Sequence, residues 1–248
     1  MGRVKAIIFD FIGTLAEVKN YSLEASKVKL YQALTEVNFN ISLDSFLKAY
    51  GEAHEKYREV RYEQLSEVTN AVWISEALNN LGFKTTPRDV NIQKAVSIFF
   101  EDYLDSLNPK QCAVQLLQTA KTEHRLGLIS NFTYAPVIRS ALKKLCMGQF
   151  FDAVMISEEV GWRKPSVKIF ERALNLLDAN AGETVYVGDS PLEDVKGARD
   201  LGMKTIFVPS QFYSVDDLRI SQQKPNFIVD DICVLQENFH AIIRELTQ

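Results

Sequence analysis

The second half of this sequence alternates short apolar runs with helical segments, and this alternation constrains the fold more than any other feature. The apolar runs lie at residues 125–130, 151–157, 184–189 and 204–209, and helical spacing of apolar residues separates them. Short strands that alternate with helices are typical of a parallel sheet with both faces covered. The pattern therefore predicts an α/β fold with a doubly wound, Rossmann-like parallel sheet.

Residues 4–9, with the sequence VKAIIF, read as one more strand. A single strand has no way to bury both of its faces, so this strand must join the same sheet. From about residue 16 to residue 107 the pattern is helical, and it contains no convincing strand. We therefore expect an all-helical domain at 16–107, inserted into an α/β core domain that is formed by 1–15 and 108–248.

Composition and charge exclude several kinds of partner. The chain has 248 residues, 46% of them hydrophobic, and a net charge of −4. Without a basic excess or a Lys/Arg run, nothing indicates binding to nucleic acid or to an anionic membrane. No apolar run is long enough to span a bilayer. We expect a monomer or homodimer that acts on a small molecule, with no nucleic-acid or membrane partner.

The cysteines favour a reducing compartment. Cys112, Cys146 and Cys233 are odd in number, far apart and not in the CxxC spacing of a zinc site. No signal peptide is apparent at the N-terminus. The sequence therefore predicts free thiols and a cytoplasmic location.

Polar side chains follow the predicted strands at their carboxyl ends, where open α/β sheets bind their ligands. They are Asp10 with Gly13 and Thr14, Ser130 with Asn131, Lys164 with Pro165, and Gly188, Asp189 and Ser190 with Asp194. Each group alone has an ordinary structural explanation, such as a turn or a helix cap. Together they suit the transfer of a phosphoryl group, whose charge needs a cation, hydroxyl groups and a lysine.

The acids and donors divide naturally between a metal and a phosphate. Asp10, Asp189 and Asp194 supply the carboxylate oxygens that Mg²⁺ prefers. Thr14, Ser130, Asn131 and Lys164 supply donors to phosphoryl oxygens. The sequence thus predicts a Mg²⁺ site beside a phosphate site.

Four segments in this order resemble the four motifs of the haloacid dehalogenase-like (HAD) hydrolase superfamily. They are IIFDFIGTL, LISNF, GWRKPSVKIF and YVGDSPLEDVKGARDLGM. The resemblance covers the core, about 1–15 and 108–230, and the helical segment lies where the family's type 1 cap belongs. It implies that residues 16–107 form a cap domain that selects the substrate.

The resemblance also assigns roles to the matching residues. Asp10 would be the nucleophile that forms an aspartyl ester or aspartyl phosphate, and Ser130 and Lys164 would act with it in catalysis. Asp189 would bind Mg²⁺ directly. Asp194 would bind it through a water molecule or would contact the residues and waters that surround it.

Ile12 departs from the family's phosphatase pattern. Phosphatases of the family carry Asp at this position, which protonates the leaving group and then activates water. Isoleucine does neither, although its backbone carbonyl is still able to contribute to the metal site. General acid–base catalysis is worth about 10²–10⁴-fold in rate.

Relatives without this acid leave alternatives open. Haloacid dehalogenases carry Tyr at this position, and phosphonate hydrolases carry Ala and need a cap lysine, which nothing here singles out. The retained Asp189 and Asp194 favour a Mg²⁺-dependent phosphatase. A 2-haloacid dehalogenase, and a weakly active or non-catalytic protein that binds a phosphorylated ligand, stay open as alternatives.

One stretch of the helical segment suggests substrate contact. The sequence HEKYREVRYEQL, residues 54–65, brings together His54, Tyr57, Arg58, Arg61 and Tyr62. An arginine here could bind a carboxylate or a second phosphate with two hydrogen bonds. A solvated helix with ordinary charge pairing explains the same residues.

Overall fold

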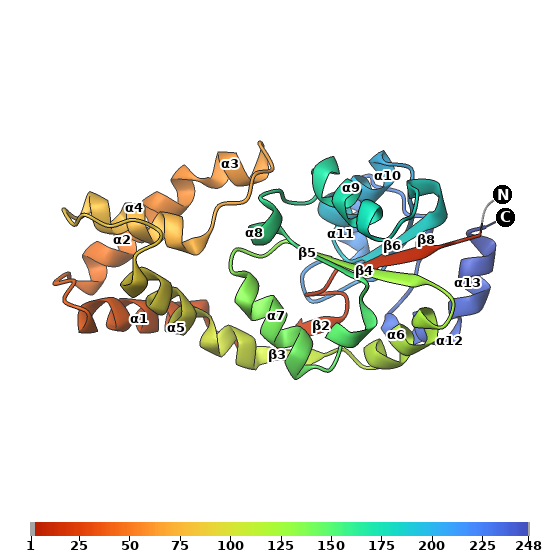
Figure 1. Cartoon of the computed structure of the whole chain (residues 1–248), viewed down its shortest axis with the longest axis horizontal. Helices are drawn as coiled ribbons and strands as arrows, with labels where there is room; N and C mark the ends of the chain where they lie inside the picture. Colours follow the sequence, from red (N-terminus) through yellow and green to blue (C-terminus); the bar gives the residue numbers. More distant parts are fainter. Residues whose placement is uncertain (1–2, 248) are drawn as a thin grey trace.

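A six-stranded parallel sheet forms the core of the protein in the computed structural model, which describes residues 3–247 (Figure 1). Its order is β5-β4-β1-β6-β7-β8. The strands are β1 (Ala6–Phe9), β4 (Arg125–Ser130), β5 (Ala153–Ile156), β6 (Thr184–Gly188), β7 (Lys204–Phe207) and β8 (Phe227–Ile228). The predicted α/β class is confirmed, and β1 lies at the centre of the sheet, between β4 and β6.

Helices cover both faces of the sheet, as the alternation predicts. Along β1, Ile7 and Phe9 belong to one apolar cluster, and Ala6 and Ile8 belong to another. The first cluster includes residues of α6 (Ala113–Lys121), α7 (Ala135–Lys144), α12 (Ile232–Glu237) and α13 (Phe239–Glu245). The second includes residues of α9 (Val167–Leu176) and α10 (Gly197–Asp200). The short helices α8 (Ser157–Val160) and α11 (Val215–Ile220) and the π-helix η3 (Pro191–Lys196) lie in the connections, with the 3₁₀ turns η1 (Gly148–Phe150) and η2 (Ala181–Glu183).

A second group of helices, which we call the helical lobe, lies apart from the sheet on the left of Figure 1. It consists of α1 (Leu23–Glu36), α2 (Leu43–Lys56), α3 (Arg58–Tyr62), α4 (Asn70–Asn80) and α5 (Val90–Ser106). Its buried residues continue the first apolar cluster, for example Phe46 and Trp73. The strands point toward this lobe, so their carboxyl ends face it.

The boundary of the lobe holds two strands that the sequence did not reveal. β2 (Ala16–Val18) and β3 (Leu107–Pro109) pair in antiparallel fashion where the chain leaves and re-enters the sheet domain. The prediction of a segment without strands was wrong for these residues. Strands of three residues are too short to show an alternating pattern.

Two of the cysteines also differ from expectation. Cys112 and Cys233 form a disulfide across 121 residues of sequence, while Cys146 is free and exposed. The prediction of free thiols was therefore wrong for Cys112 and Cys233. Their pairing depends on the packing of α6 against α12, which spacing along the chain does not reveal.

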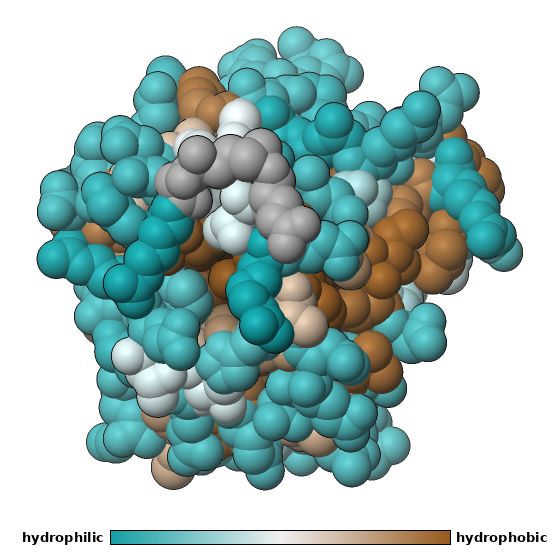
Figure 2. All heavy atoms as spheres, turned by 90° about the vertical axis from the view of Figure 1, so that its right-hand side faces the viewer, coloured by the Kyte–Doolittle hydropathy of each residue, from teal (hydrophilic) through white to brown (hydrophobic). Residues whose placement is uncertain are grey.

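The end of the sheet domain opposite the helical lobe faces the viewer in Figure 2. Its surface is mostly hydrophilic, with apolar side chains gathered toward one margin. None of the helices between residues 3 and 247 combines the length and apolar character of a membrane span.

Candidate active site

The polar residues that follow β1, β4 and β6 meet at one edge of the sheet. The register pairs Phe9 with Leu128 and with Val187, so Asp10 lies within one residue of the level of Ser130 and Asp189 on the neighbouring strands. Parallel strands bring their carboxyl ends to one edge. The structure thus brings together the predicted acids Asp10, Asp189 and Asp194 with the predicted donor Lys164.

Lys164 lies at the centre of this cluster. Its Nζ is 2.6 Å from Asp10 Oδ1 and 2.7 Å from Asp194 Oδ1, and it also contacts the Ile129 carbonyl and the Tyr186 hydroxyl at 3.1 Å. The side chain is 1% exposed. Burial lowers the pKa of Lys164, but Asp10 and Asp194 outweigh it and raise that pKa well above its usual value. The ammonium is therefore a permanent positive charge between two carboxylates.

Asn131 fixes the main chain of Lys164. Its Oδ1 accepts a hydrogen bond from the Lys164 N–H at 2.8 Å, and its Nδ2 donates to the Lys164 carbonyl at 3.0 Å. The side chain of Asn131 thus positions the lysine, and its contact with phosphate stays a prediction. Ser130 and Thr14 are both buried.

Asp10, Asp189 and Asp194 offer oxygen atoms that lie within 4.8 Å of one another. Asp194 is fully engaged: Oδ1 accepts from Lys164 and from the Tyr186 hydroxyl at 2.9 Å, and Oδ2 accepts from the N–H groups of Asp189 and Ser190. Asp189 Oδ2 accepts from the Ser210 hydroxyl at 2.5 Å. Asp194 therefore anchors the cluster, and Asp10 and Asp189 keep free oxygen atoms.

Two buried oxygen atoms mark the place for a ligand. Among residues 3–247, Asp10 Oδ2 and Thr14 Oγ1 find no hydrogen-bond partner. A buried polar atom without a partner costs free energy, so such atoms indicate a bound group. Free carboxylate oxygens on Asp10 and Asp189 are the donor set that Mg²⁺ prefers, and these residues fit that ion.

The carboxyl groups repel one another when no cation is present. Burial raises the pKa of Asp10 to about 6, and Asp194 adds to this effect while Lys164 opposes it. Burial also raises the pKa of Asp189 to about 8, with Asp10 and Asp194 adding their repulsion. Strongly shifted carboxyl groups in one cluster are typical of functional sites.

Two glycines allow the main chain to approach the carboxylates of Asp189 and Asp194 closely. A Cβ atom on Gly13 would lie 2.2 Å from Asp189 Oδ2, and the φ angle of Gly13 is +103°. A Cβ atom on Gly188 would lie 2.5 Å from Asp194 Cγ. The glycines of the first and fourth motifs therefore make room for the two acids of the fourth motif.

Ile12 brings no acid to this site. Its side chain is half-buried and packs against the first apolar cluster. The location of its carbonyl relative to a metal stays a prediction.

Sequence reasoning missed Tyr186 and Ser210. Tyr186 lies inside β6, is 1% exposed, and bonds both Lys164 and Asp194. A tyrosine in a buried strand needs a partner for its hydroxyl, which was the available signal. Ser210 follows β7, and nothing in its local sequence indicates that it reaches Asp189.

Comparison with known proteins agrees with this geometry. A family model described as "Haloacid dehalogenase-like hydrolase" matches residues 7–208. A glyceraldehyde 3-phosphate phosphatase of Methanothermobacter thermautotrophicus is 29% identical over 94% of this chain and 99% of its own length. A protein of the same name from Methanocaldococcus jannaschii is 45% identical over 82% of this chain and 84% of its own length.

Solved structures share the fold. A 2-haloacid dehalogenase from Pseudomonas syringae pv. Tomato superposes with a TM-score of 0.69 at 20% identity, covering 96% of this chain and 99% of its own. A protein described as a "predicted phosphoglycolate phosphatase" from Haemophilus somnus gives a TM-score of 0.60 at 18% identity, with both chains covered completely. At these identities the likeness concerns the fold alone.

Gly13→Ala tests the close approach of Asp189. Because the new Cβ atom would overlap Asp189 Oδ2, the acid must move, and a displacement of about 1 Å costs on the order of 100-fold in catalytic rate. We expect a loss of at least that size in kcat/KM and weaker Mg²⁺ binding by calorimetry. Gly82→Ala is the control, since φ is +91° there but a Cβ atom meets nothing within 4 Å in the described structure. Equal effects of both substitutions would show that backbone strain alone matters.

The stabilisation by Mg²⁺ should depend on pH. The folded-state pKa of Asp189 lies at about 8, above its usual 3.8, so the metal-free folded protein loses stability as pH rises through this range. Mg²⁺ binds the deprotonated carboxylates and offsets this loss. We expect the rise in Tm on adding Mg²⁺ to be small at about pH 5 and to grow toward about pH 8.

Asp189→Asn should abolish the increase with pH of the Tm shift that Mg²⁺ causes. Asp216→Asn, in an exposed pair with Arg219, should preserve that increase. A rise in Tm of the same size at both pH values in the unmodified protein would contradict the assignment.

Proposed function

Since the chain belongs to the haloacid dehalogenase-like hydrolase family, we propose that it is a Mg²⁺-dependent phosphatase that acts on a small phosphorylated molecule through Asp10. One observation carries this proposal. Asp10 presents a buried oxygen atom, Oδ2, without a partner among residues 3–247, while Lys164 holds the other oxygen atom of the same carboxylate. A carboxylate fixed at one oxygen and free at the other is prepared to act as a nucleophile.

In the first step, Asp10 Oδ2 attacks the phosphorus atom of the substrate. The new O–P bond forms as the bond from phosphorus to the leaving oxygen breaks, and the leaving oxygen takes up a proton. Lys164 stays beside Asp10 and supplies positive charge, and the Thr14 hydroxyl is free to donate to a phosphoryl oxygen. Asp189 and the carboxylate of Asp10 would hold Mg²⁺, which would supply the remaining positive charge that the phosphoryl oxygens need.

In the second step, water attacks the aspartyl phosphate, the bond between phosphorus and Asp10 breaks, and inorganic phosphate leaves. Both steps involve a proton transfer that a second aspartate would assist in the family's phosphatases. Ile12 has no proton to give or accept. The proton of the first step therefore comes from solvent, unless the leaving group is acidic enough to depart as an anion, and the proton that water loses in the second step goes to solvent or to the phosphate.

The dehalogenase alternative is less well supported. The fold likeness to a 2-haloacid dehalogenase is good, but it concerns the fold alone. A haloacid needs no metal, whereas this chain retains Asp189 and Asp194 and anchors them with Tyr186 and Ser210. The relatives of 29% and 45% identity are named as phosphatases.

We also propose that residues 16–107 act as a cap domain. The helical lobe faces the carboxyl ends of the strands, where Asp10 and Lys164 lie. The lobe joins the sheet domain through the β2–β3 pair, and Glu67 of the lobe pairs with Arg163, next to Lys164. A lobe in this position would cover a bound substrate and select it.

The function is tested by phosphate release from p-nitrophenyl phosphate, with chloride release from 2-chloropropionate measured in parallel. We expect phosphate release that depends on Mg²⁺, is removed by chelation and is lost in Asp10→Asn. Asp44→Asn, at an exposed position of α2, is the matched control and should retain activity. Chloride release that persists under chelation would favour the dehalogenase, and no turnover of either substrate would favour a non-catalytic binding protein.

The isoleucine at position 12 predicts a strong dependence on the leaving group. The leaving groups of aryl and acyl phosphates depart as stable anions, whereas the alkoxide of an alkyl phosphate needs a proton as it departs. Ile12→Asp should raise kcat/KM for alkyl phosphates by up to about 10²-fold and change that for aryl phosphates little. Ile12→Leu, which keeps the apolar packing, should leave the ratio unchanged. An unmodified enzyme that hydrolyses both classes equally well would show that another group supplies the proton.

A further inference from the structure

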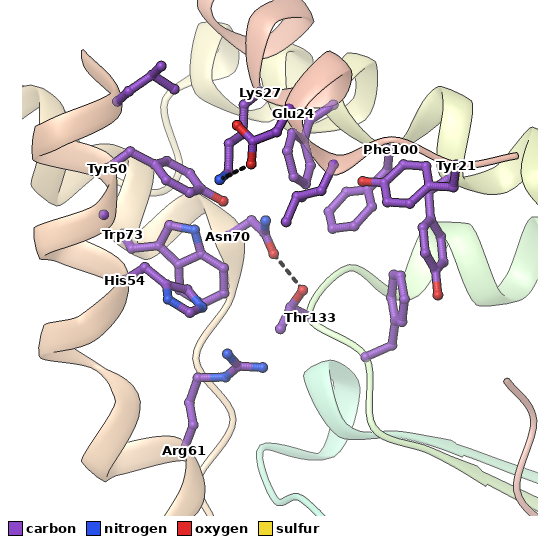
Figure 3. A pocket seen from close by; sticks show the side chains of 16 residues that line it. Tyr21, Glu24, Lys27, Tyr50, His54, Arg61, Asn70, Trp73, Phe100 and Thr133 are labelled. Carbon is purple, nitrogen blue, oxygen red and sulfur yellow. Dashed lines mark hydrogen bonds and ion pairs between the residues drawn. The ribbon is translucent and has the colours of Figure 1, made fainter. Parts of the chain in front are cut away.

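A pocket lies between the helical lobe and the sheet domain, and it has no role in the chemistry described above (Figure 3). Its volume is about 440 Å³. We call it the lobe pocket, and its lining includes Tyr50, Arg61, Asn70, Trp73, Phe100 and Thr133. A volume of this size is typical of small-molecule sites.

The lobe pocket adjoins the catalytic cluster. Phe132 and Thr133, which line it, directly follow Ser130 and Asn131 in the chain. Arg61 lines the pocket and also a second hollow that reaches Lys164 and Ser190. A substrate that presents its phosphate to Asp10 would therefore extend toward this pocket.

The walls of the lobe pocket are aromatic, and their polar groups are mainly donors. Trp73 is 3% exposed, and its Nε1 has no partner among residues 3–247. Asn70 uses its Oδ1 to accept from the Thr133 hydroxyl at 2.5 Å, which leaves its Nδ2 as a donor. Glu24 is the one carboxylate on the described lining, and Lys27 neutralises it at 2.8 Å. A group rich in acceptors fits these walls.

Arg61 is held in a fixed orientation at the mouth of this pocket. Its Nε donates to Glu67 Oε1 at 3.2 Å, and its guanidinium lies 5.2 Å from the ring of Trp73. Figure 3 shows the terminal nitrogen atoms of Arg61 directed into the pocket. Since Glu67 contacts only the Nε atom in the described structure, the two terminal groups are available to a ligand.

Glu67 is shared between two arginines at this point. Its side chain is 1% exposed, and it serves both Arg61 and Arg163, whose Nη1 lies 2.7 Å from Oε2. The hydroxyl of Ser157 also donates to Oε2. Glu193 is a further partner of Arg163 at 3.5 Å. Two carboxylates thus face the two arginines, and the attraction of Arg61 for an anion lies in its two terminal nitrogen groups, which neither carboxylate contacts in the described structure.

We propose that the lobe pocket binds the end of the substrate that does not react, and that this end carries a second anionic oxygen group. Arg61 binds this group, a carboxylate or a phosphate, with two hydrogen bonds. Trp73 and Asn70 donate to the rest of this end. Glu67 is a positioning residue that orients Arg61. The inference rests on the proposed phosphatase function, because it assigns the substrate of that site.

Two matched pairs of substrates test this proposal. The first pair, glyceraldehyde 3-phosphate and 3-phosphoglycerate, differs by a carboxylate, and the second, ribulose 5-phosphate and ribulose 1,5-bisphosphate, differs by a phosphate. In at least one pair, kcat/KM for the compound with the second anion should be higher by about 10-fold or more. The pair that shows the preference identifies the anion.

Variants of Arg61 then test whether this residue causes the preference for the compound with the second anionic group. Arg61→Gln should remove the preference, with a loss of about 10- to 100-fold for the doubly anionic compound relative to its singly anionic partner. Arg61→Lys should retain part of it. Arg58→Gln is the matched control, since Arg58 lies on the same helix but is 65% exposed and pairs with Glu55. Trp73→Phe, which keeps the ring but removes the N–H, should cost about 3- to 10-fold.

The outcomes of these experiments separate the assignment of the lobe pocket from the proposed phosphatase function. No preference in either pair, or a preference that survives Arg61→Gln, overturns the assignment of the lobe pocket. If Arg61→Gln fails to fold, the unmodified enzyme and Trp73→Phe still decide. Calorimetric binding of both pairs to the Asp10→Asn protein separates this inference from the proposed function. Preferential binding there without turnover in the unmodified enzyme would retain the pocket and reject the phosphatase.

Discussion

The ammonium group of Lys164 is the interaction on which the site depends. It lies between Asp10 and Asp194, which would otherwise repel each other in a buried environment. Removal of one partner from a buried charge cluster typically costs about 3–5 kcal/mol, because the remaining charges lose their compensation. Lys164 holds one oxygen of Asp10, the proposed nucleophile, and leaves the other free, so the same contact stabilises the site and orients Asp10.

Much of the surrounding structure fixes this one lysine or the acids that it contacts. Asn131 brackets its main chain, Tyr186 bonds both its Nζ and Asp194, and Gly188 makes room for the Asp194 carboxylate. Arg163, the preceding residue, forms an ion pair with Glu67 of the helical lobe. The position of the lysine is therefore linked both to the sheet and to the lobe that faces it.

Sequence alone predicted the parallel sheet and the residues at its edge, because both depend on local patterns. An apolar run that ends in Asp10 and an alternation of strands and helices are visible along the chain. The contacts of Tyr186 and Ser210 were not predictable in this way, since they depend on how β6 packs against the connecting segments and how those segments pack against one another. The same holds for the disulfide of Cys112 and Cys233 and for the ion pairs of Glu67, which depend on tertiary packing.

The central claim is that Asp10 receives the phosphoryl group and that Ile12 leaves the second step without a base. The most direct measurement is rapid acid quench during hydrolysis of an aryl phosphate, followed by mass spectrometry of the intact protein and its peptides. We expect a burst of the phenol product, a slower steady rate, and one phosphoryl group per chain on Asp10. Steady turnover without a burst and without a phosphorylated Asp10, or a phosphoryl group on another residue, would contradict the account.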